Sequence, residues 1–141
     1  MQHSTVQGHL VMSLVVSNEL SFRIVVDLEY DAADPYAVRF TFHLPGDEPV
    51  TWVFARELLL DGISRPSGEG DVHIHPVGGE LSDVRIVLHS PGGAAQLRAS
   101  APPLVAFLAR TDRLVEMGQE LTSGELEAQL ADILGGCENA G

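Results

Sequence analysis

Residues 30–62 read YDAADPYAVRFTFHLPGDEPVTWVFARELLLDG, and residues 65–76 continue as RPSGEGDVHIHP. Apolar side chains recur at every second position in 38–42 and again in 50–54, which is the period of a strand with one buried face. Pro45-Gly46-Asp47 lies between them as a turn sequence, and such a short connection makes the two strands antiparallel neighbours. The stretch has no nucleophile elbow, phosphate loop or cysteine cluster, so it specifies a fold without a recognisable reaction.

The same alternation continues on both sides of this stretch. It predicts seven strands in all, at 10–16, 22–28, 38–42, 50–54, 72–74, 84–88 and, more weakly, 95–99. Three segments have helical character: Ala55 to Leu60 with Gly62 as its C-cap, a segment that starts after Ser100, and a segment from Thr122 to Leu134 that opens with a capping box. The order resembles a unit of four strands and a helix used about twice. We therefore predict an α+β protein with antiparallel sheet of about seven strands, a short middle helix and two C-terminal helices.

Composition limits the classes of function. A chain of 141 residues fits one domain, and its 45% apolar content argues against disorder. The net charge is −12 and all eight positive side chains are arginines. This acidic balance argues against general nucleic-acid affinity and against direct docking on anionic lipid. Cys137 is the single cysteine, which favours a reducing compartment, and the N-terminal residues lack the features of a signal peptide. We expect a cytoplasmic protein.

The strand faces opposite the apolar alternates carry an unusual share of the cationic side chains. A candidate contact face is predicted there, made of Arg23, Arg39, His43, His73, His75, Arg85, His89 and Arg98. One interpretation is a solvated face of a one-sided antiparallel sheet. The other is an interface, because arginines with interspersed valines suit protein contacts. A homo-oligomer that covers this face is the favoured form of the second interpretation.

The histidines of the predicted contact face also raise the question of metal binding. Asp71, His73 and His75 alternate along one strand and resemble zinc ligands, with His43 or His89 as a further ligand if their strands are adjacent. Histidine pairs at this spacing are common in strands, however, so no metal ligand is assigned. No catalytic residue, cofactor or cofactor-binding residue is predicted either.

Single-stranded nucleic-acid binding is the alternative function. A twisted sheet with exposed aromatic side chains can stack bases. Here the aromatic side chains fall by alternation on the apolar, helix-covered side, namely Phe22, Phe40, Phe42, Trp52 and Phe54. This placement and the net charge weigh against the alternative.

Two segments in series carry a resemblance to a known family. They are Asp34-Pro35-Tyr36-Ala37-Val38 and Trp52-Val53-Phe54-Ala55-Arg56, with Gly70-Asp71-Val72 and Pro76 after them. On these residues the chain resembles the SsgA-like proteins, cell-division regulators of sporulating actinomycetes, and its compact length favours the SsgB branch. The resemblance spans about residues 10 to 134, and gives one SsgA-like domain at 1–134 followed by a disordered tail at 135–141.

The resemblance implies a function without enzyme activity. Members act in sporulation-specific septation, where the SsgB branch helps to place the tubulin-like division protein FtsZ at septum sites and promotes its assembly. It implies FtsZ and an SsgA-type protein as partners, a homotrimer of Whirly-like fold, a location at the division septum, and an indirect association with the membrane. His73 and His75 stand where family members carry other side chains, which further weakens the metal interpretation.

Overall fold

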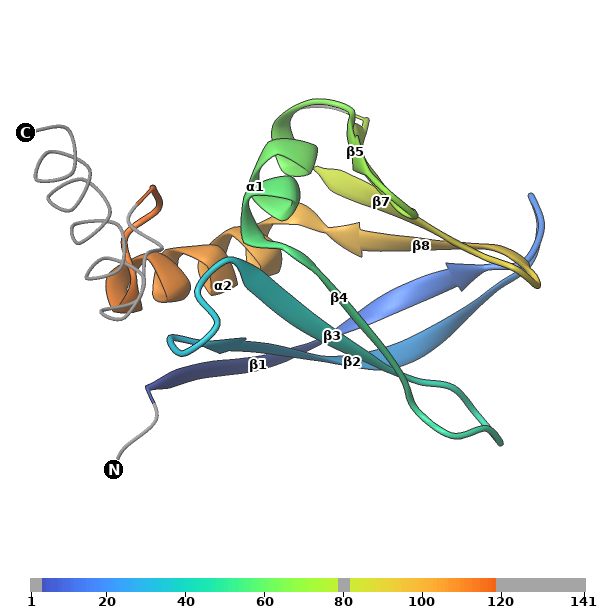
Figure 1. The fold of residues 1–141 in the computed structure, drawn as a ribbon. Coiled ribbons are helices and arrows are strands. Elements are labelled where there is room, and N and C mark those ends of the chain that lie inside the picture. The colour runs from blue at the N-terminus through green and yellow to red at the C-terminus, as the bar shows by residue number, and fades with distance from the viewer. Residues whose placement is uncertain (1–3, 79–81, 119–141) are drawn as a thin grey trace, which may run out of the picture.

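A computed structural model describes residues 4–78 and 82–118 of the chain (Figure 1). Its strands and helices follow the order β1 (Thr5–Val15), β2 (Ser21–Asp31), β3 (Ala37–His43), β4 (Val50–Ala55), α1 (Arg56–Ser64), β5 (Ser67–Glu69), β6 (Val72–Val77), β7 (Asp83–Ser90), β8 (Gly93–Ser100) and α2 (Ala101–Leu114). The predicted α+β class and the antiparallel sheet are confirmed. The described chain runs through four strands and a helix twice in succession. The third predicted helix, Thr122 to Leu134, lies outside the described residues.

The strand count was predicted wrongly, because the described residues form eight strands rather than seven. The missed strand is β5, which pairs with β6 through only three residue pairs. Its sequence, Ser67-Gly68-Glu69, contains no apolar side chain and therefore no alternation to detect. A strand of this kind is held by its backbone pairing and not by burial.

All eight strands form one antiparallel sheet in the order β4-β3-β2-β1-β8-β7-β6-β5. Each half is a meander of four strands, and the halves meet where Ser13–Val15 of β1 pairs with Gln96–Arg98 of β8. This junction is short compared with the pairing of β1 and β2, which extends from Thr5 to Val15. In Figure 1 the two halves diverge, with β1–β4 below and β6–β8 above.

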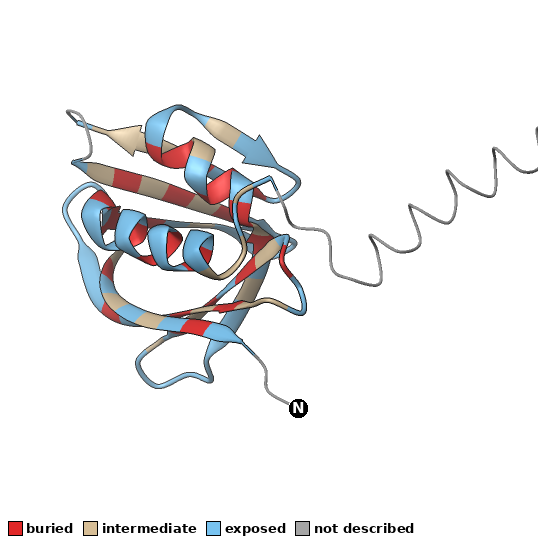
Figure 2. Ribbon diagram, turned by 90° about the vertical axis from the view of Figure 1, so that its left-hand side faces the viewer, coloured by how far each residue is buried: buried red, intermediate tan, exposed pale blue. Residues whose placement is uncertain are grey.

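The two helices lie on the side of the sheet that carries the apolar alternates. α1 packs mainly on β6 and α2 on β1, and the two helices also touch each other. Their buried faces turn towards the sheet in Figure 2. The largest apolar side chains that are completely buried in this core are Tyr30, Phe40, Met12, Leu28, Leu59, Ile74, Ile86 and Leu104. We call this side the inner face and the opposite side the outer face of the sheet.

The end of α1 was also predicted wrongly. Gly62 was expected to cap the helix, yet it lies inside it, and the C-cap is Arg65, whose N–H donates to the carbonyl of Asp61. The reason for a glycine here is a close approach to β6. A Cβ added to Gly62 would overlap the side chain of Ile74. Gly62 therefore brings helix and sheet together and does not end the helix.

The junction between β4 and α1 carries a fully buried arginine. Arg56 is 0% exposed, and its Nη1 donates to the carbonyl oxygens of Thr111 at 3.1 Å and Val115 at 2.7 Å. Its guanidinium lies over the ring of Tyr30, with 4.7 Å between Cζ and the ring centroid, while the Tyr30 hydroxyl donates to the carbonyl of Pro35. Arg56 therefore joins the first half of the fold to the end of α2, where the Thr111 carbonyl also accepts from the N–H of Val115. Neither α1 nor α2 is long and apolar enough to cross a membrane.

Candidate functional site

The outer face of the sheet holds all eight residues of the predicted contact face. Arg23 lies on β2, Arg39 and His43 on β3, His73 and His75 on β6, Arg85 and His89 on β7, and Arg98 on β8. Each alternates with buried neighbours along its strand, which fixes the side to which it points. The register between strands then shows which of these side chains are neighbours.

Carboxylates of β2 lie beside the two β3 residues of the predicted contact face. Arg39 Nη1 lies 3.4 Å from Glu29 Oε1, and His43 Nε2 lies 2.7 Å from Asp27 Oδ2. Both acidic residues come from β2. Glu29 stands directly opposite Arg39, and Asp27 stands diagonally opposite His43. Arg39 and His43 thus have partners on the neighbouring strand.

A row of five residues crosses the centre of the outer face. Arg23 stands opposite Ser13, Ser13 opposite Arg98, Arg98 opposite Arg85, and Arg85 opposite His75, so the row crosses β2, β1, β8, β7 and β6. We call these five residues the basic row. Neighbouring strands are about 4.8 Å apart, so the row is about 19 Å long. It contains three of the eight arginines of an acidic chain.

Only one carboxylate of the described residues neutralises the basic row. Asp83 Oδ2 accepts from Arg98 Nε at 2.7 Å. Arg23 and Arg85 form no ion pair within residues 4–78 and 82–118, and the Nε of Arg85 is buried without a hydrogen-bond partner there. Arg85 and Arg98 are also directly opposite each other, an arrangement of like charges that destabilises a sheet.

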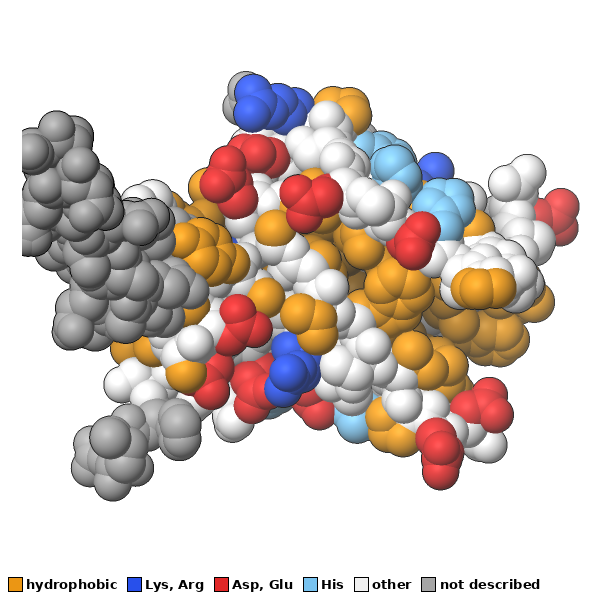
Figure 3. Space-filling model, in the orientation of Figure 1, with side chains coloured by type: hydrophobic (Ala, Val, Ile, Leu, Met, Phe, Trp, Pro, Cys, Tyr) orange, Lys and Arg blue, Asp and Glu red, His pale blue; other side chains and the backbone are white. Residues whose placement is uncertain are grey.

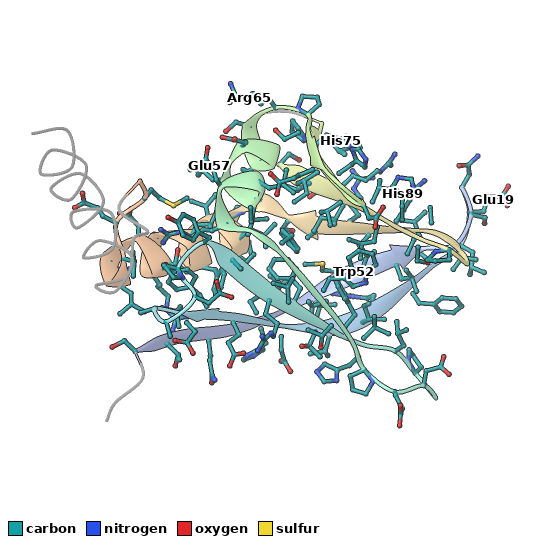
Figure 4. The ribbon with its side chains drawn as sticks, viewed as in Figure 1. Glu19, Trp52, Glu57, Arg65, His75 and His89 are labelled. Carbon is teal, nitrogen blue, oxygen red and sulfur yellow. The ribbon has the colours of Figure 1, made fainter. Side chains whose placement is uncertain are left out.

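Three histidines lie on the same part of the outer face. His75 ends the basic row, and the rings of His73 and His89 make an edge-on contact with 5.3 Å between centroids. Figure 4 shows His75 and His89 on the upper half of the sheet. Of the residues considered as metal ligands, His73 and His89 touch, whereas His43 lies on β3, four strands away from β7 in the sheet order. In the described ranges no three His, Cys, Asp or Glu side chains are placed to hold a metal ion.

An apolar cleft on the inner face was missed by the sequence analysis. It has a volume of about 440 Å³ and opens between the two halves of the sheet, at the end that the helices leave uncovered. Its lining is mainly Leu14, Ile24, Phe42, Leu44, Val50, Trp52, Leu88 and Leu97. Figure 3 shows the hydrophobic surface in this hollow, and Figure 4 places Trp52 beside it.

The cleft corrects the expectation that helices cover all inner-face aromatic side chains. Phe40 is 0% exposed and Phe54 is buried, but Phe22 is 48% exposed and Trp52 is only partly buried. All four have inner-face alternation, so the period of the strands predicts the side correctly. It does not predict how far the helices reach along that side.

The comparison with known proteins agrees with the sequence motifs. Residues 24–120 match the family described as Streptomyces sporulation and cell division protein, SsgA. The chain is 46% identical over 133 residues to the sporulation-specific cell division protein SsgB of Streptomyces coelicolor, covering 94% of this chain and 97% of that one. It is 45% identical over 124 residues to SsgB of Thermobifida fusca, covering 87% and 90% of the two chains.

Two solved structures have the same fold. One comes from work on SsgB mutations in Streptomyces coelicolor sporulation; it superposes with a TM-score of 0.79 at 48% identity and covers 84% of this chain and 94% of that one. The other is the crystal structure of an SsgA-like sporulation-specific cell division protein from Thermobifida fusca, with a TM-score of 0.80 at 42% identity and coverage of 92% and 95%.

Proposed function

Because this chain belongs to the SsgA family and groups with its SsgB members, we propose that it is a non-enzymatic regulator of sporulation-specific cell division. It binds the tubulin-like division protein FtsZ, recruits it to septum sites and promotes its assembly there. The observation that carries the proposal is similarity over almost the whole length of relatives named as sporulation-specific cell division proteins. The surfaces described above suit a protein that works by contact with other proteins.

Self-association is part of the proposal. Copies of a chain with net charge −12 repel one another, so a homotrimer needs apolar contact to offset that repulsion. The apolar cleft, with half-exposed Phe22 at the same end of the strands, supplies such a surface. We place self-association there and not on the outer face favoured from the sequence, which leaves the outer face free for a second protein. An SsgA-type protein is the further partner. The protein acts at the septum, and its contact with the membrane runs through these partners.

Sedimentation of FtsZ polymers tests the proposal. Purified FtsZ is polymerised with GTP, with and without this protein, and the pellet is analysed for both chains. We expect this protein to appear in the pellet and the mass of polymer to rise. GDP, with which no polymer forms, is the control for protein that sediments by itself. A chain that stays in the supernatant and leaves the polymer mass unchanged would refute the proposal.

A further inference from the structure

We propose that the basic row is a docking site for an acidic, extended segment of a partner protein. The row consists of Arg23, Ser13, Arg98, Arg85 and His75 on five neighbouring strands. The proposal rests on the proposed function in taking the partner to be a division protein. Its test uses neither FtsZ nor polymer, so that the two proposals can fail separately.

The basic row carries positive charge that the described residues do not compensate. On β3 both cationic or histidine side chains, Arg39 and His43, have carboxylates of β2 beside them, at Glu29 and Asp27. On the basic row the described residues supply Asp83 alone, for three arginines. An anionic partner therefore meets free guanidinium groups here, and arginine binds carboxylates through two parallel hydrogen bonds.

Arg85 has an unfavourable position when the basic row is empty. It faces Arg98 on one side and His75 on the other, and its Nε is buried without a partner among the described residues. Like charges opposite each other in a sheet cost stability, and a buried donor without an acceptor adds to that cost. A carboxylate bound between the guanidinium groups of Arg85 and Arg98 offsets the repulsion between them. The empty row is therefore less stable than the occupied one.

The length of the basic row and the valines beside it suit an extended protein segment. An extended chain advances about 3.3 Å per residue, so about six residues match the row of about 19 Å. Valines flank the row on both sides: Val11 and Val25, 48% and 46% exposed, and the partly buried Val15 and Val87. Apolar side chains of the same segment contact these valines, as in the core of a protein interface.

A protein segment fits this surface better than a nucleic acid does. Single-stranded bases stack on aromatic side chains, and the aromatic side chains of β2, β3 and β4 are on the inner face. The basic row on the outer face contains no Phe, Tyr or Trp. The acidic remainder of the chain repels a long polyanion, which extends beyond the row, more than it repels a short segment.

The binding test uses the full chain and a fluorescein-labelled decaglutamate peptide, followed by fluorescence anisotropy at low salt. The row variant combines Arg23→Gln and Arg85→Gln. The matched control combines Arg39→Gln and Arg65→Gln, which changes the net charge equally but lies off the row. Arg39 is paired with Glu29, and the side chain of Arg65 is 72% exposed at the end of α1. Circular dichroism melts check that each variant is folded.

We expect the peptide to bind, its affinity to fall as salt is raised, and the row variant to lose about tenfold in affinity. The control variant should lose less than twofold. If the double variant does not fold, Arg23→Gln alone, at an exposed position, should still weaken binding. Absence of binding by the unmodified chain, equal losses in both variants, or tighter binding of a labelled twenty-residue oligothymidine would each overturn the proposal.

Discussion

Arg85 on β7 and Arg98 on β8 stand directly opposite each other on the outer face of the sheet, and only Arg98 has a carboxylate partner among the described residues. The protein therefore places a destabilising pair of like charges at the centre of the outer face. Replacing Arg85 should therefore weaken binding at the basic row without weakening the fold. Single substitutions can measure these two effects separately.

Replacing Arg85 by glutamine should not destabilise the fold. The change removes the like-charge contact with Arg98 and the buried Nε that lacks a partner. We expect the free energy of unfolding in urea to rise by about 0.2–1 kcal/mol. Arg39→Gln, which breaks an exposed ion pair with Glu29, should change it by less than about 1 kcal/mol in the opposite direction. If Arg85→Gln lowered the free energy of unfolding by more than about 1 kcal/mol, the role of Arg85 would be structural.

Replacing Arg56 by methionine should severely destabilise the protein. The substitution leaves the carbonyls of Thr111 and Val115 without this donor and removes the cation from the Tyr30 ring. We expect a loss of about 2–4 kcal/mol in the free energy of unfolding. Arg65→Met, at a largely exposed side chain, is the control and should cost less than about 1 kcal/mol. Equal effects of the two changes would contradict the assigned role of Arg56.

Gly62→Ala should destabilise the protein although alanine is the better helix former. The added methyl group overlaps Ile74, so helix and sheet must separate, at a cost of about 1–3 kcal/mol. This exceeds the gain in helix propensity of about 1 kcal/mol at most. Gly92→Ala meets no atom within 4 Å and serves as the control. Thermal melts of both variants would decide, and an unchanged melting temperature for Gly62→Ala would count against the close packing of α1 on β6.

Two phenylalanines on the inner face should respond very differently to truncation. Phe40→Ala empties a fully buried site and should cost about 3–5 kcal/mol. Phe22 is half-exposed beside the cleft, and Phe22→Ala should cost about 1 kcal/mol or less. Urea denaturation measures both. Similar losses would mean that Phe22 is covered in solution by the protein's own residues.

Trp52 reports on the apolar cleft because it is the single tryptophan of the chain. If self-association covers the cleft, its emission should shift to longer wavelength when the protein is diluted from micromolar to nanomolar concentration. Light scattering should give a mass three times the 15.1 kDa of one chain before dilution. Phe22→Asp should favour the dissociated state at all concentrations. An emission spectrum that does not change with concentration, together with a monomer mass, would contradict the proposed oligomer.

The sequence predicts the sides of the strands well, because burial of one face imposes a strict period of two. It therefore placed Arg23 and Arg85 on the same face correctly. It does not show the exact register of neighbouring strands, and so it does not show that Arg39 pairs with Glu29 while Arg85 faces Arg98. The pairing of β1 with β8, which places Ser13 opposite Arg98, joins strands far apart in the chain and is not predicted from the sequence either.

The failures of the prediction also have physical causes. A glycine near the end of a helical segment is typical of a C-cap, and only the contact of Gly62 with Ile74 on β6 reveals its other role. β5 has no apolar side chain to mark it. The open cleft beside Trp52 depends on the reach of α1 and α2 across the sheet, which alternation within a strand does not encode.

The most direct test of the account is cosedimentation of this protein with FtsZ polymers for three forms of the chain: unmodified, the row variant Arg23→Gln with Arg85→Gln, and the control Arg39→Gln with Arg65→Gln. The account predicts that the unmodified and control forms enter the polymer pellet and that the row variant remains in the supernatant. An unmodified chain that stays in the supernatant at every concentration of polymer would contradict the account.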